Sequence, residues 1–532
     1  MPPPQRGSCW LVQDKQLDEN ELKTLLQSNP SELQVAVLGS AGHSASRYRA
    51  LPSLVLLRGK DAWVFDAGDD TQRQLGAMAH VRPSKVFRLF MTSLTSESVA
   101  GLPGLLCTIG QARVRGHETT DIPIHVYGPP GLANFLANIY MVSHTYLEVA
   151  IVVHELVSVA VPDQERQPEQ INRRARIFTT QLPPDQLNPE GATDACLAAF
   201  KPTQGRAVTA KGSKAGGGVL AFDSRAAYLP FPDPQPGDPE RAPPPHHQLR
   251  WTLQIDVGAQ VVAVALPSPQ PDSPRFAFVI QEADRSGALV VERAQALGIP
   301  PGRAYSELKE GRAVQNLVGQ TIPPELCVSP KRPGRRVVIM STCHSLPPRD
   351  AAFWDAAQDA DLLVTGTVLP DELVLPRGLE LSNDKMKSNI SGAVMHNVSN
   401  SNGANRASSS SSSRSMESSW GVSGRGVGGA EQAGFERGMA AQVVQGLAAS
   451  EVGELAAGLG TRKVLLTRFD TRLHGPDTPP AVDALIPTML RQALRQAVAT
   501  TAAAGAGRRA DEHVAGFAAG EDFHVLVLDK NL

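Results

Sequence analysis

The sequence is poor in cysteine, and its few cysteines are scattered. It has five in 532 residues, with no CxxC pair and no regular framework: Cys9, Cys107, Cys196, Cys327 and Cys343. Paired cysteines are typical of cysteine-based zinc sites, and disulfide frameworks are typical of oxidising compartments. The spacing therefore argues against a structural zinc on cysteine. It favours an intracellular protein of the cytoplasm or nucleus, with an organelle left open.

The sequence also lacks long apolar runs and an excess of one charge. No window approaches the roughly 20 apolar residues of a membrane helix, and acidic residues near the start argue against a signal or transit peptide. We therefore expect no membrane partner. The 51 basic and 53 acidic residues leave a net charge of −2, so RNA could be attracted only by a local basic patch.

Short aliphatic runs that alternate with helical patterns are what the sequence does contain. LQVAVLGSAG, VFRLFMTSL, QVVAVAL, RFAFVIQEA, RRVVIMST, KVLLTRF and DFHVLVLD read as strands. GLPGLLCTIGQA, the stretch 438–459 and AVDALIPTMLRQALRQAV read as helices, the second ahead of KVLLTRF and the third ahead of an Ala/Gly tract. Strands that alternate with helices favour βαβ layering, so patterning predicts an α/β protein.

Changes in composition divide the chain into six segments. We expect an N-terminal extension at 1–34, a first half of the α/β domain at 35–161, and an insertion or arm, partly disordered, at 162–249. The second half of the domain follows at 250–381. Residues 382–430 are rich in Ser, Asn and Gly and read as a disordered linker. Residues 431–532 would then complete the fold.

Eight segments share their order and rough spacing with one known family. They are VLGSAGHSASRYRALPSLVL, WVFDAGDDTQRQL, MTSLTSESVAGLPGLL, IHVYGPPGL, IPPGRAYSELKEG, DADLLVTGTV, KVLLTRFD and AGEDFHVLVL. Each is a modest signal alone, but together they resemble the short form of RNase Z, the tRNA 3′-end endonuclease of the metallo-β-lactamase superfamily. The resemblance implies a four-layer αβ/βα sandwich, two zinc ions and a homodimer.

The resemblance also implies where the zinc ligands should be. In the family a His-x-His-x-Asp-His loop follows the strand that resembles MTSL. Here the three histidine positions match Ser93, Thr95 and Ser98, and the aspartate position matches Glu97. Hydroxyls are poor zinc ligands compared with imidazole.

The remaining ligand positions are also altered. A family histidine falls at or near Pro267, the bridging aspartate at Thr342 or Ser341, and the last histidine at Arg468, where an arginine places a fixed positive charge. The family's His-Glu-Ala-Thr element reads as residues 365–368, and its His-Ser-Thr loop falls near 447–449. The comparison predicts that no cofactor is bound. A metal site relocated to other histidines or cysteines is a minor alternative.

Three basic residues are candidates for substrate binding. Arg47 and Arg49 align with the family's basic loop after the first strand, and Lys309 lies in SELKEG. Each could equally be a solvated turn or surface residue. Arginine and lysine hold phosphates without a metal, so RNA binding could outlast catalysis.

Three functions stay open at this point. The first is a catalytically inactive RNase Z homologue that binds tRNA or precursor tRNA, or that pairs as a homodimer or with an active paralogue. The second is a structural subunit of a larger assembly. The third is an active tRNA 3′ endonuclease, a phosphodiesterase with an unconventional metal site.

Overall fold

A computed structural model of the chain describes somewhat more than half of its length. The described residues are 33–46, 49–59, 61–78, 81–116, 122–159, 169–172, 176–185, 245–256, 258–268, 273–284, 287, 289–329, 333–343, 345–366, 368–369, 446–469, 481–503, 516–519 and 525–528. Most of the expected N-terminal extension, most of the expected insertion and the whole expected linker lie outside them.

The first of two large sheets has nine strands in the order β20-β1-β2-β3-β4-β5-β6-β8-β7. Strands β3 to β6 and β8 run parallel, whereas β20 closes the edge antiparallel to β1. The bounds are β1 (Leu33–Gly39), β2 (Ser53–Arg58), β3 (Asp61–Phe65), β4 (Val86–Phe90), β5 (Ile124–Gly128), β6 (Ile151–Leu156), β7 (Glu169–Asn172), β8 (Ile177–Leu182) and β20 (Val525–Leu528). Strands β7 and β8 lie inside the segment 162–249, so part of the expected insertion belongs to this sheet.

The second sheet has seven strands in the order β19-β18-β15-β14-β11-β10-β9. It combines an antiparallel meander with parallel strands joined through helices. The bounds are β9 (Arg250–Asp256), β10 (Ala259–Leu266), β11 (Arg275–Glu282), β14 (Arg336–Thr342), β15 (Leu362–Gly366), β18 (Lys463–Thr467) and β19 (Gly516–Ala519). Strand β19 falls in what reads from sequence only as an Ala/Gly tract.

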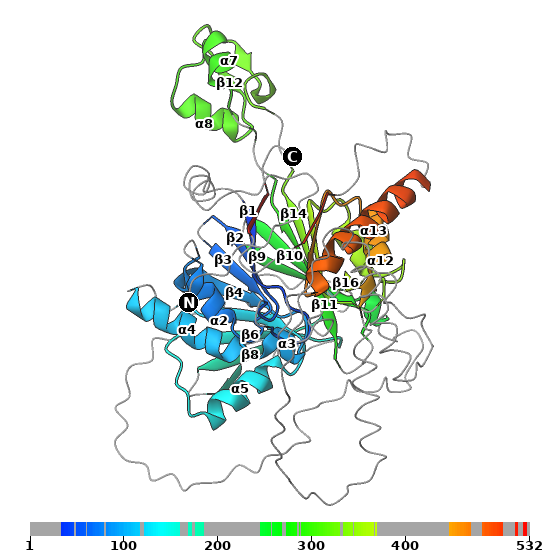
Figure 1. The fold of residues 1–532 in the computed structure, drawn as a ribbon. Helices are drawn as coiled ribbons and strands as arrows, with labels where there is room; N and C mark the ends of the chain where they lie inside the picture. Colours follow the sequence, from blue (N-terminus) through cyan, green and yellow to red (C-terminus); the bar gives the residue numbers. More distant parts are fainter. Residues whose placement is uncertain are drawn as a thin grey trace, which may run out of the picture.

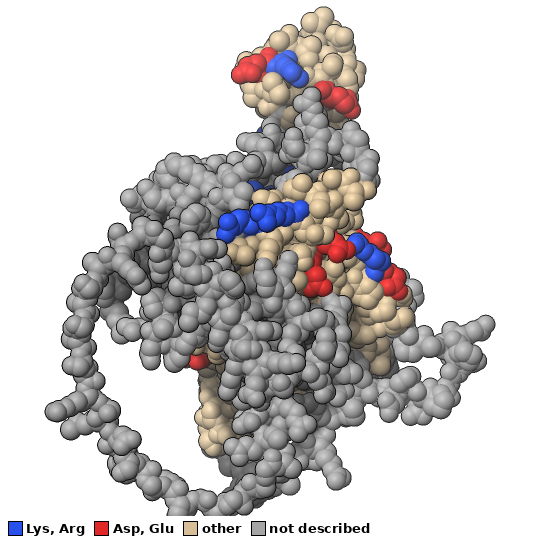
Figure 2. All heavy atoms as spheres, turned by 45° about the vertical axis from the view of Figure 1, so that its right-hand side comes forward, with Lys and Arg blue, Asp and Glu red and all other residues tan. Residues whose placement is uncertain are grey.

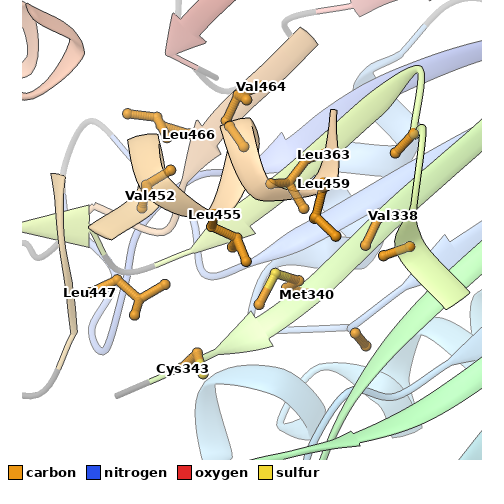
Figure 3. Close-up of a cluster of buried hydrophobic side chains, with 14 of the residues drawn as sticks. Val338, Met340, Cys343, Leu363, Leu447, Val452, Leu455, Leu459, Val464 and Leu466 are labelled. Atoms are coloured by element: carbon orange, nitrogen blue, oxygen red, sulfur yellow. The ribbon is translucent and has the colours of Figure 1, made fainter. Parts of the chain in front are cut away.

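Helices cover the outer face of each sheet (Figure 1). Helices α2 (Thr71–Ala77), α3 (Ser96–Val99), α4 (Leu102–Arg115) and α5 (Leu132–Val142) share one buried apolar cluster with the first sheet. Helices α9 (Ala352–Ala357), α12 (Ala449–Leu459) and α13 (Ala481–Ala503) share another with the second sheet. Figure 3 shows Leu455 and Leu459 of α12 directed toward Met340 and Leu363. None of the described helices is long and apolar enough to cross a membrane.

A third apolar cluster consists of the inner faces of both sheets. Burial of these faces removes the alternating aliphatic side chains from water, which is the main stabilising term for such a sandwich. The succession is therefore helices, sheet, sheet, helices. The expected four-layer αβ/βα sandwich is confirmed.

A row of stacked rings crosses the inner face of the first sheet. It runs from Phe65 through Phe90 and Tyr127 to His154 and His125, with neighbouring ring centroids 4.5–5.2 Å apart. His154 Nε2 lies 2.9 Å from His125 Nδ1, and its Nδ1 lies 2.9 Å from the Thr180 hydroxyl. Burial lowers the pKa of His125 to about 4. These histidines are hydrogen-bonded parts of the core.

One short strand replaces part of an expected helix. Helical periodicity predicts a helix over 438–459, of which residues 446–459 are described. Leu447–Ala448 instead form strand β17, paired with β16 (Val368–Leu369), and α12 begins at Ala449. The Glu451 carboxylate accepts a hydrogen bond from the Ala448 backbone N–H at 2.9 Å. This carboxylate satisfies a backbone donor where the helix starts, so the chain changes from strand to helix there.

A small lobe is inserted between β11 and β14. It contains α7 (Val291–Ala296), α8 (Arg303–Lys309), β12 (Val314–Gln315), β13 (Thr321–Ile322) and a core of its own. Figure 1 shows it projecting from the sandwich, joined by two segments of chain.

Candidate functional site at the carboxyl ends of the strands

Polar side chains from both sheets meet where the parallel strands end. Asp66 follows β3, Thr92 follows β4, Thr342 ends β14 and Arg468 follows β18. Carboxyl ends of parallel strands share one edge of a sheet, which is where α/β proteins place their ligand sites. The cluster therefore occupies the position at which a site is expected.

A buried ion pair joins the two sheets at this edge. The Arg468 guanidinium contacts the Asp66 carboxylate through Nη2 and Oδ2, and their side chains are 4% and 1% exposed. Asp66 also accepts hydrogen bonds from the Thr92 backbone N–H and hydroxyl, at 2.8–3.0 Å. Burial raises the pKa of Asp66, and Arg468 and Thr92 oppose that rise because they stabilise the carboxylate.

The backbone holds both partners in an uncommon conformation. Asp66 has a φ of 57° and Arg468 a φ of 55°. Non-glycine residues adopt such left-handed values rarely, and they do so mostly at turns and functional sites. Both side chains are thereby turned toward the space between the sheets, where they meet.

Gly366 leaves the space that the arginine fills. A Cβ built on Gly366 would stand 2.2 Å from Arg468 Cδ, far inside van der Waals contact. Any larger residue would therefore push the arginine out of its place. This glycine stands at the glutamate position of the family's His-Glu-Ala-Thr element, so two departures from the family pattern fit each other sterically.

The three hydroxyls of the Ser93–Ser98 loop bond to one another. Ser93 Oγ lies 2.8 Å from Thr95 Oγ1 and 3.0 Å from Ser98 Oγ, and Thr95 donates weakly to Ser98 at 3.4 Å. Ser93 and Ser98 are almost fully buried. The structure thus brings together the three positions that match family histidines.

Glu97, in the same loop, pairs with a histidine from the first strand–loop segment. Its Oε1 lies 3.6 Å from His43 Nδ1, and its side chain is 11% exposed. Burial acts to raise the pKa of Glu97, but hydrogen bonding to His43 and to its own backbone, with the charges of His43 and Arg468, lowers it to about 2. Glu97 is therefore an anion held within the chain.

A second buried arginine lies beside the first. Arg275 opens β11, is 8% exposed, and donates from Nη1 to the Thr342 carbonyl at 2.7 Å. Arg468 Nη1 approaches the hydroxyl of the same threonine at 3.5 Å. Burial lowers the pKa of Arg275, and the charges of Glu97 and Cys343 oppose that effect.

Sequence reasoning found the loop and Arg468, but not Asp66, Arg275 or His43. Asp66 stands inside the recognised FDAGDD segment, which is a signal that could have identified it. Arg275 and His43 carry no such signal, because only the fold shows that they reach the cluster.

The other predicted residues lie elsewhere or outside the described chain. Pro267 directly follows β10 and is half-buried. Arg49 is 6% exposed, with its guanidinium on the Ser40 hydroxyl at 2.8 Å and over the Phe469 ring. Lys309 is exposed on α8 of the lobe. Arg47 is outside the described residues, as is Thr367.

The residues at the cluster do not fit a pair of zinc ions. Zinc sites need imidazole, thiolate or carboxylate groups that converge on one point. Across the described parts of the chain, no group of three or more His, Cys, Asp or Glu residues could hold a metal. A guanidinium contacts Asp66, and a histidine holds Glu97, so both carboxylates at the cluster already have partners within the chain.

Comparisons with known proteins give relatives named as zinc phosphodiesterases and as RNase Z enzymes. No family model matches the chain. It is 29% identical to the zinc phosphodiesterase ELAC protein 1 of Bos taurus over 340 residues, which cover 64% of this chain and 77% of that protein. It is 24% identical to ribonuclease Z of Lactiplantibacillus plantarum over 335 residues, 62% of this chain and 74% of that protein. The crystal structure of the short form of human tRNase Z overlies 93% of the chain with a TM-score of 0.42 and 17% identity.

Proposed function

Because this chain is an RNase Z-like protein of the metallo-β-lactamase superfamily, we propose that it is a non-hydrolytic homologue that binds precursor tRNA. A single observation carries the proposal. The buried Arg468–Asp66 pair stands among the strand ends at which the resemblance places two metals. A guanidinium there supplies one positive charge in place of the metals, but it is not a Lewis acid and cannot bind a water and lower its pKa as zinc does.

The relatives support a connection with tRNA. Proteins named ribonuclease Z are similar to this chain, and its eight segments resemble the family that cleaves tRNA at the 3′ end. Binding would rely on local basic groups, because the chain has no excess of positive charge. Among the candidates Arg47, Arg49 and Lys309, the structure describes an exposed side chain for Lys309. Arg49 would have to leave the Phe469 ring to meet a phosphate.

A salt titration tests the proposal. Binding of precursor tRNA to the full chain is measured by filter retention at several salt concentrations. We expect log affinity to fall linearly with log salt, because each phosphate contact releases condensed counterions. Lys309→Gln should reduce the slope by about one contact. Glu307→Gln, on the same helix, is the matched control and should leave the slope unchanged or make it steeper. Binding no tighter than to an unrelated RNA would refute the proposal.

Pairing with an active relative is a second form of the same proposal. The resemblance implies a homodimer, and a chain without hydrolysis could pair with itself or with an active paralogue. Light scattering of the purified chain, alone and mixed with an active RNase Z from the same source, distinguishes these states. A monomer in both samples contradicts pairing.

The surface charge favours a different candidate, a structural subunit of a larger assembly. On the face drawn in Figure 2, described Lys and Arg residues are mixed with Asp and Glu on the lobe and at one edge of the sandwich, and one band of Lys and Arg lies apart from them. Over the whole chain 51 basic residues are balanced by 53 acidic ones, so no overall positive field draws it to RNA. If the salt titration shows no specific binding while affinity purification from the native source recovers stable protein partners, the structural function is supported instead.

Retained phosphodiesterase activity with an unconventional metal arrangement is tested directly. Elemental analysis of the purified chain should find less than about 0.1 zinc per chain if the metals have been given up. Stoichiometric zinc together with cleavage of precursor tRNA would establish an active enzyme and overturn the proposal of a non-hydrolytic protein.

A further inference from the structure

Arg275 is a buried cation whose hydrogen bonds are mostly unmade. Only its Nη1 group has a partner among the described residues, the Thr342 carbonyl at 2.7 Å. Its Nε is fully buried and has no partner. A buried charged donor without an acceptor is costly and is rare in native structures. The guanidinium therefore has capacity for an acceptor that the chain does not provide.

The nearby carboxylates are committed to other groups. Asp66 is in contact with Arg468, and Glu97 lies on His43. No described carboxylate comes within 4.0 Å of Arg275, which has no ion pair of its own. Glu97 and Cys343 act on Arg275 only through longer-range attraction. Arg275 therefore has no carboxylate in direct contact among the described residues.

The loop that carries three hydroxyl groups lies against the start of the strand that Arg275 opens. The backbone N–H of Phe276 donates to the Thr92 carbonyl at 2.9 Å, so the start of β11 lies against the loop that carries Ser93, Thr95 and Ser98. Hydroxyls that bond only to one another can rotate and donate to an anion instead. A guanidinium fork with several hydroxyls beside it is a donor set suited to a tetrahedral oxyanion.

We propose that Arg275 and the hydroxyls of the Ser93–Ser98 loop bind a phosphate group. Arg275 supplies Nε and Nη2 as paired donors, the loop supplies hydroxyls, and Arg468 on the far side of Thr342 adds positive charge. The phosphate group is either free inorganic phosphate or the terminal phosphate of an RNA. The second source rests on the proposed function, whereas the site itself does not depend on it.

Titration of the full chain with inorganic phosphate tests the site. Calorimetry at constant ionic strength, with chloride as the reference anion, should show saturable binding of one phosphate per chain. Arg275→Gln should weaken it at least about tenfold, the loss expected for a charged donor pair. Arg275→Lys keeps the charge but loses the fork, so its affinity should fall between the two. Arg303→Gln, an exposed arginine 93% accessible on the lobe, is the control and should bind as the unaltered chain does.

A second measurement does not depend on any variant being folded. The ³¹P resonance of inorganic phosphate should broaden or shift when the unaltered chain is added. An unchanged resonance at millimolar phosphate, or equal heats for phosphate and chloride, would overturn the inference. So would equal phosphate affinity in the unaltered chain and a folded Arg275→Gln variant.

Two RNA oligonucleotides of one sequence distinguish the sources of the phosphate. Tighter binding of the form ending in a 3′-phosphate than of the form ending in a 3′-hydroxyl identifies an RNA terminus, and inorganic phosphate should compete with it. Equal affinities together with saturable phosphate binding identify a site for free phosphate. Specific binding of precursor tRNA without any phosphate site would leave the proposed function standing and reject this inference alone.

Discussion

The two ends of strands β11 and β14 both carry a buried arginine, but only one of these arginines is satisfied. At the lobe end, Arg335 donates from Nε and Nη2 to the two oxygens of Glu282, at 2.5 and 3.0 Å. At the other end, Arg275 has one carbonyl acceptor and a buried Nε without a partner. The same pair of strands therefore holds a complete ion pair at one end and an incomplete one at the other.

We interpret Arg335 as a structural residue and Arg275 as a binding residue. A bidentate arginine–carboxylate pair fixes two strands and leaves nothing for a ligand. An arginine with free donors stabilises the fold less than its burial costs, so its presence requires another explanation. The Arg468–Asp66 pair lies at the same end of the strands as Arg275, but both of its charges have a partner. It joins the two sheets, whereas the Arg335–Glu282 pair joins two strands of one sheet.

The largest effect is expected from removal of Arg468. Arg468→Ala leaves the Asp66 carboxylate buried without its partner and should lower the free energy of unfolding by about 3–5 kcal/mol, measured in urea. Arg335→Ala should cost less, because Arg58 remains 3.8 Å from Glu282. A double variant, Asp66→Asn with Arg468→Met, removes both charges and should recover part of the loss. A double variant less stable than Arg468→Ala would contradict the pairing.

The next effect is the pH dependence that Glu97 contributes. Its pKa falls from 4.5 to about 2 in the folded chain, so the folded state favours the carboxylate. The resulting stability is present above pH 4.5 and is lost as the pH falls toward 2. The shift corresponds to about 3 kcal/mol. Glu97→Gln should abolish this part of the acid dependence in denaturant titrations at several pH values, whereas the exposed Glu307→Gln should not. If stability falls with pH in the same way for the unaltered chain, Glu97→Gln and Glu307→Gln, Glu97 does not cause the acid dependence.

A smaller loss of stability is expected from a substitution at Gly366, which leaves room for the Arg468 side chain. Gly366→Ala places a Cβ against the arginine side chain and should cost about 1–3 kcal/mol by overpacking. Gly76, in helix α2, is the matched control because a Cβ there meets nothing within 4 Å. Gly76→Ala should stabilise the chain by about 0.5–1 kcal/mol. Thermal unfolding of both variants measures the contrast, and shifts of the same sign would count against the steric fit.

The smallest effect on stability should come from Arg275. Arg275→Met removes the unpaired donors, so the free energy of unfolding should stay within about 1 kcal/mol of the original or rise. Arg335→Met, at the satisfied end of the same strands, should be clearly less stable. Equal losses in urea denaturation would mean that both arginines are structural.

Much of the fold could be predicted because its strands are aliphatic and bounded by turn residues. LQVAVLG and RFAFVIQE show the pattern and form β1 and β11. Strand β19, GFAA, is too short and too rich in alanine to show it, although Phe517 packs in the core and β18 pairs with the strand. Strand β8, IFTTQL, lies in a polar segment whose pattern does not predict a strand, and pairing with β6 and burial of Ile177 place it in the sheet.

The site was only partly predictable because its partners are remote in sequence. The loop at Ser93–Ser98 could be located from a family motif. That Asp66 would contact Arg468 depends on the packing of two sheets, which no local pattern encodes. The unpaired Nε of Arg275 is a property of its surroundings, so it could not be predicted from the sequence.

The lobe between β11 and β14 leaves and re-enters the sandwich at one place. Its two strand ends stay hydrogen-bonded there, with the Glu282 backbone N–H on the Arg335 carbonyl at 2.9 Å and the Gly334 N–H on Asp284 at 3.1 Å. Topologically the lobe is an enlarged hairpin turn. A chain in which a short turn replaces the lobe should still pair β11 with β14 and form the second sheet. The contribution of the lobe to binding can therefore be measured by deleting it and then restoring it.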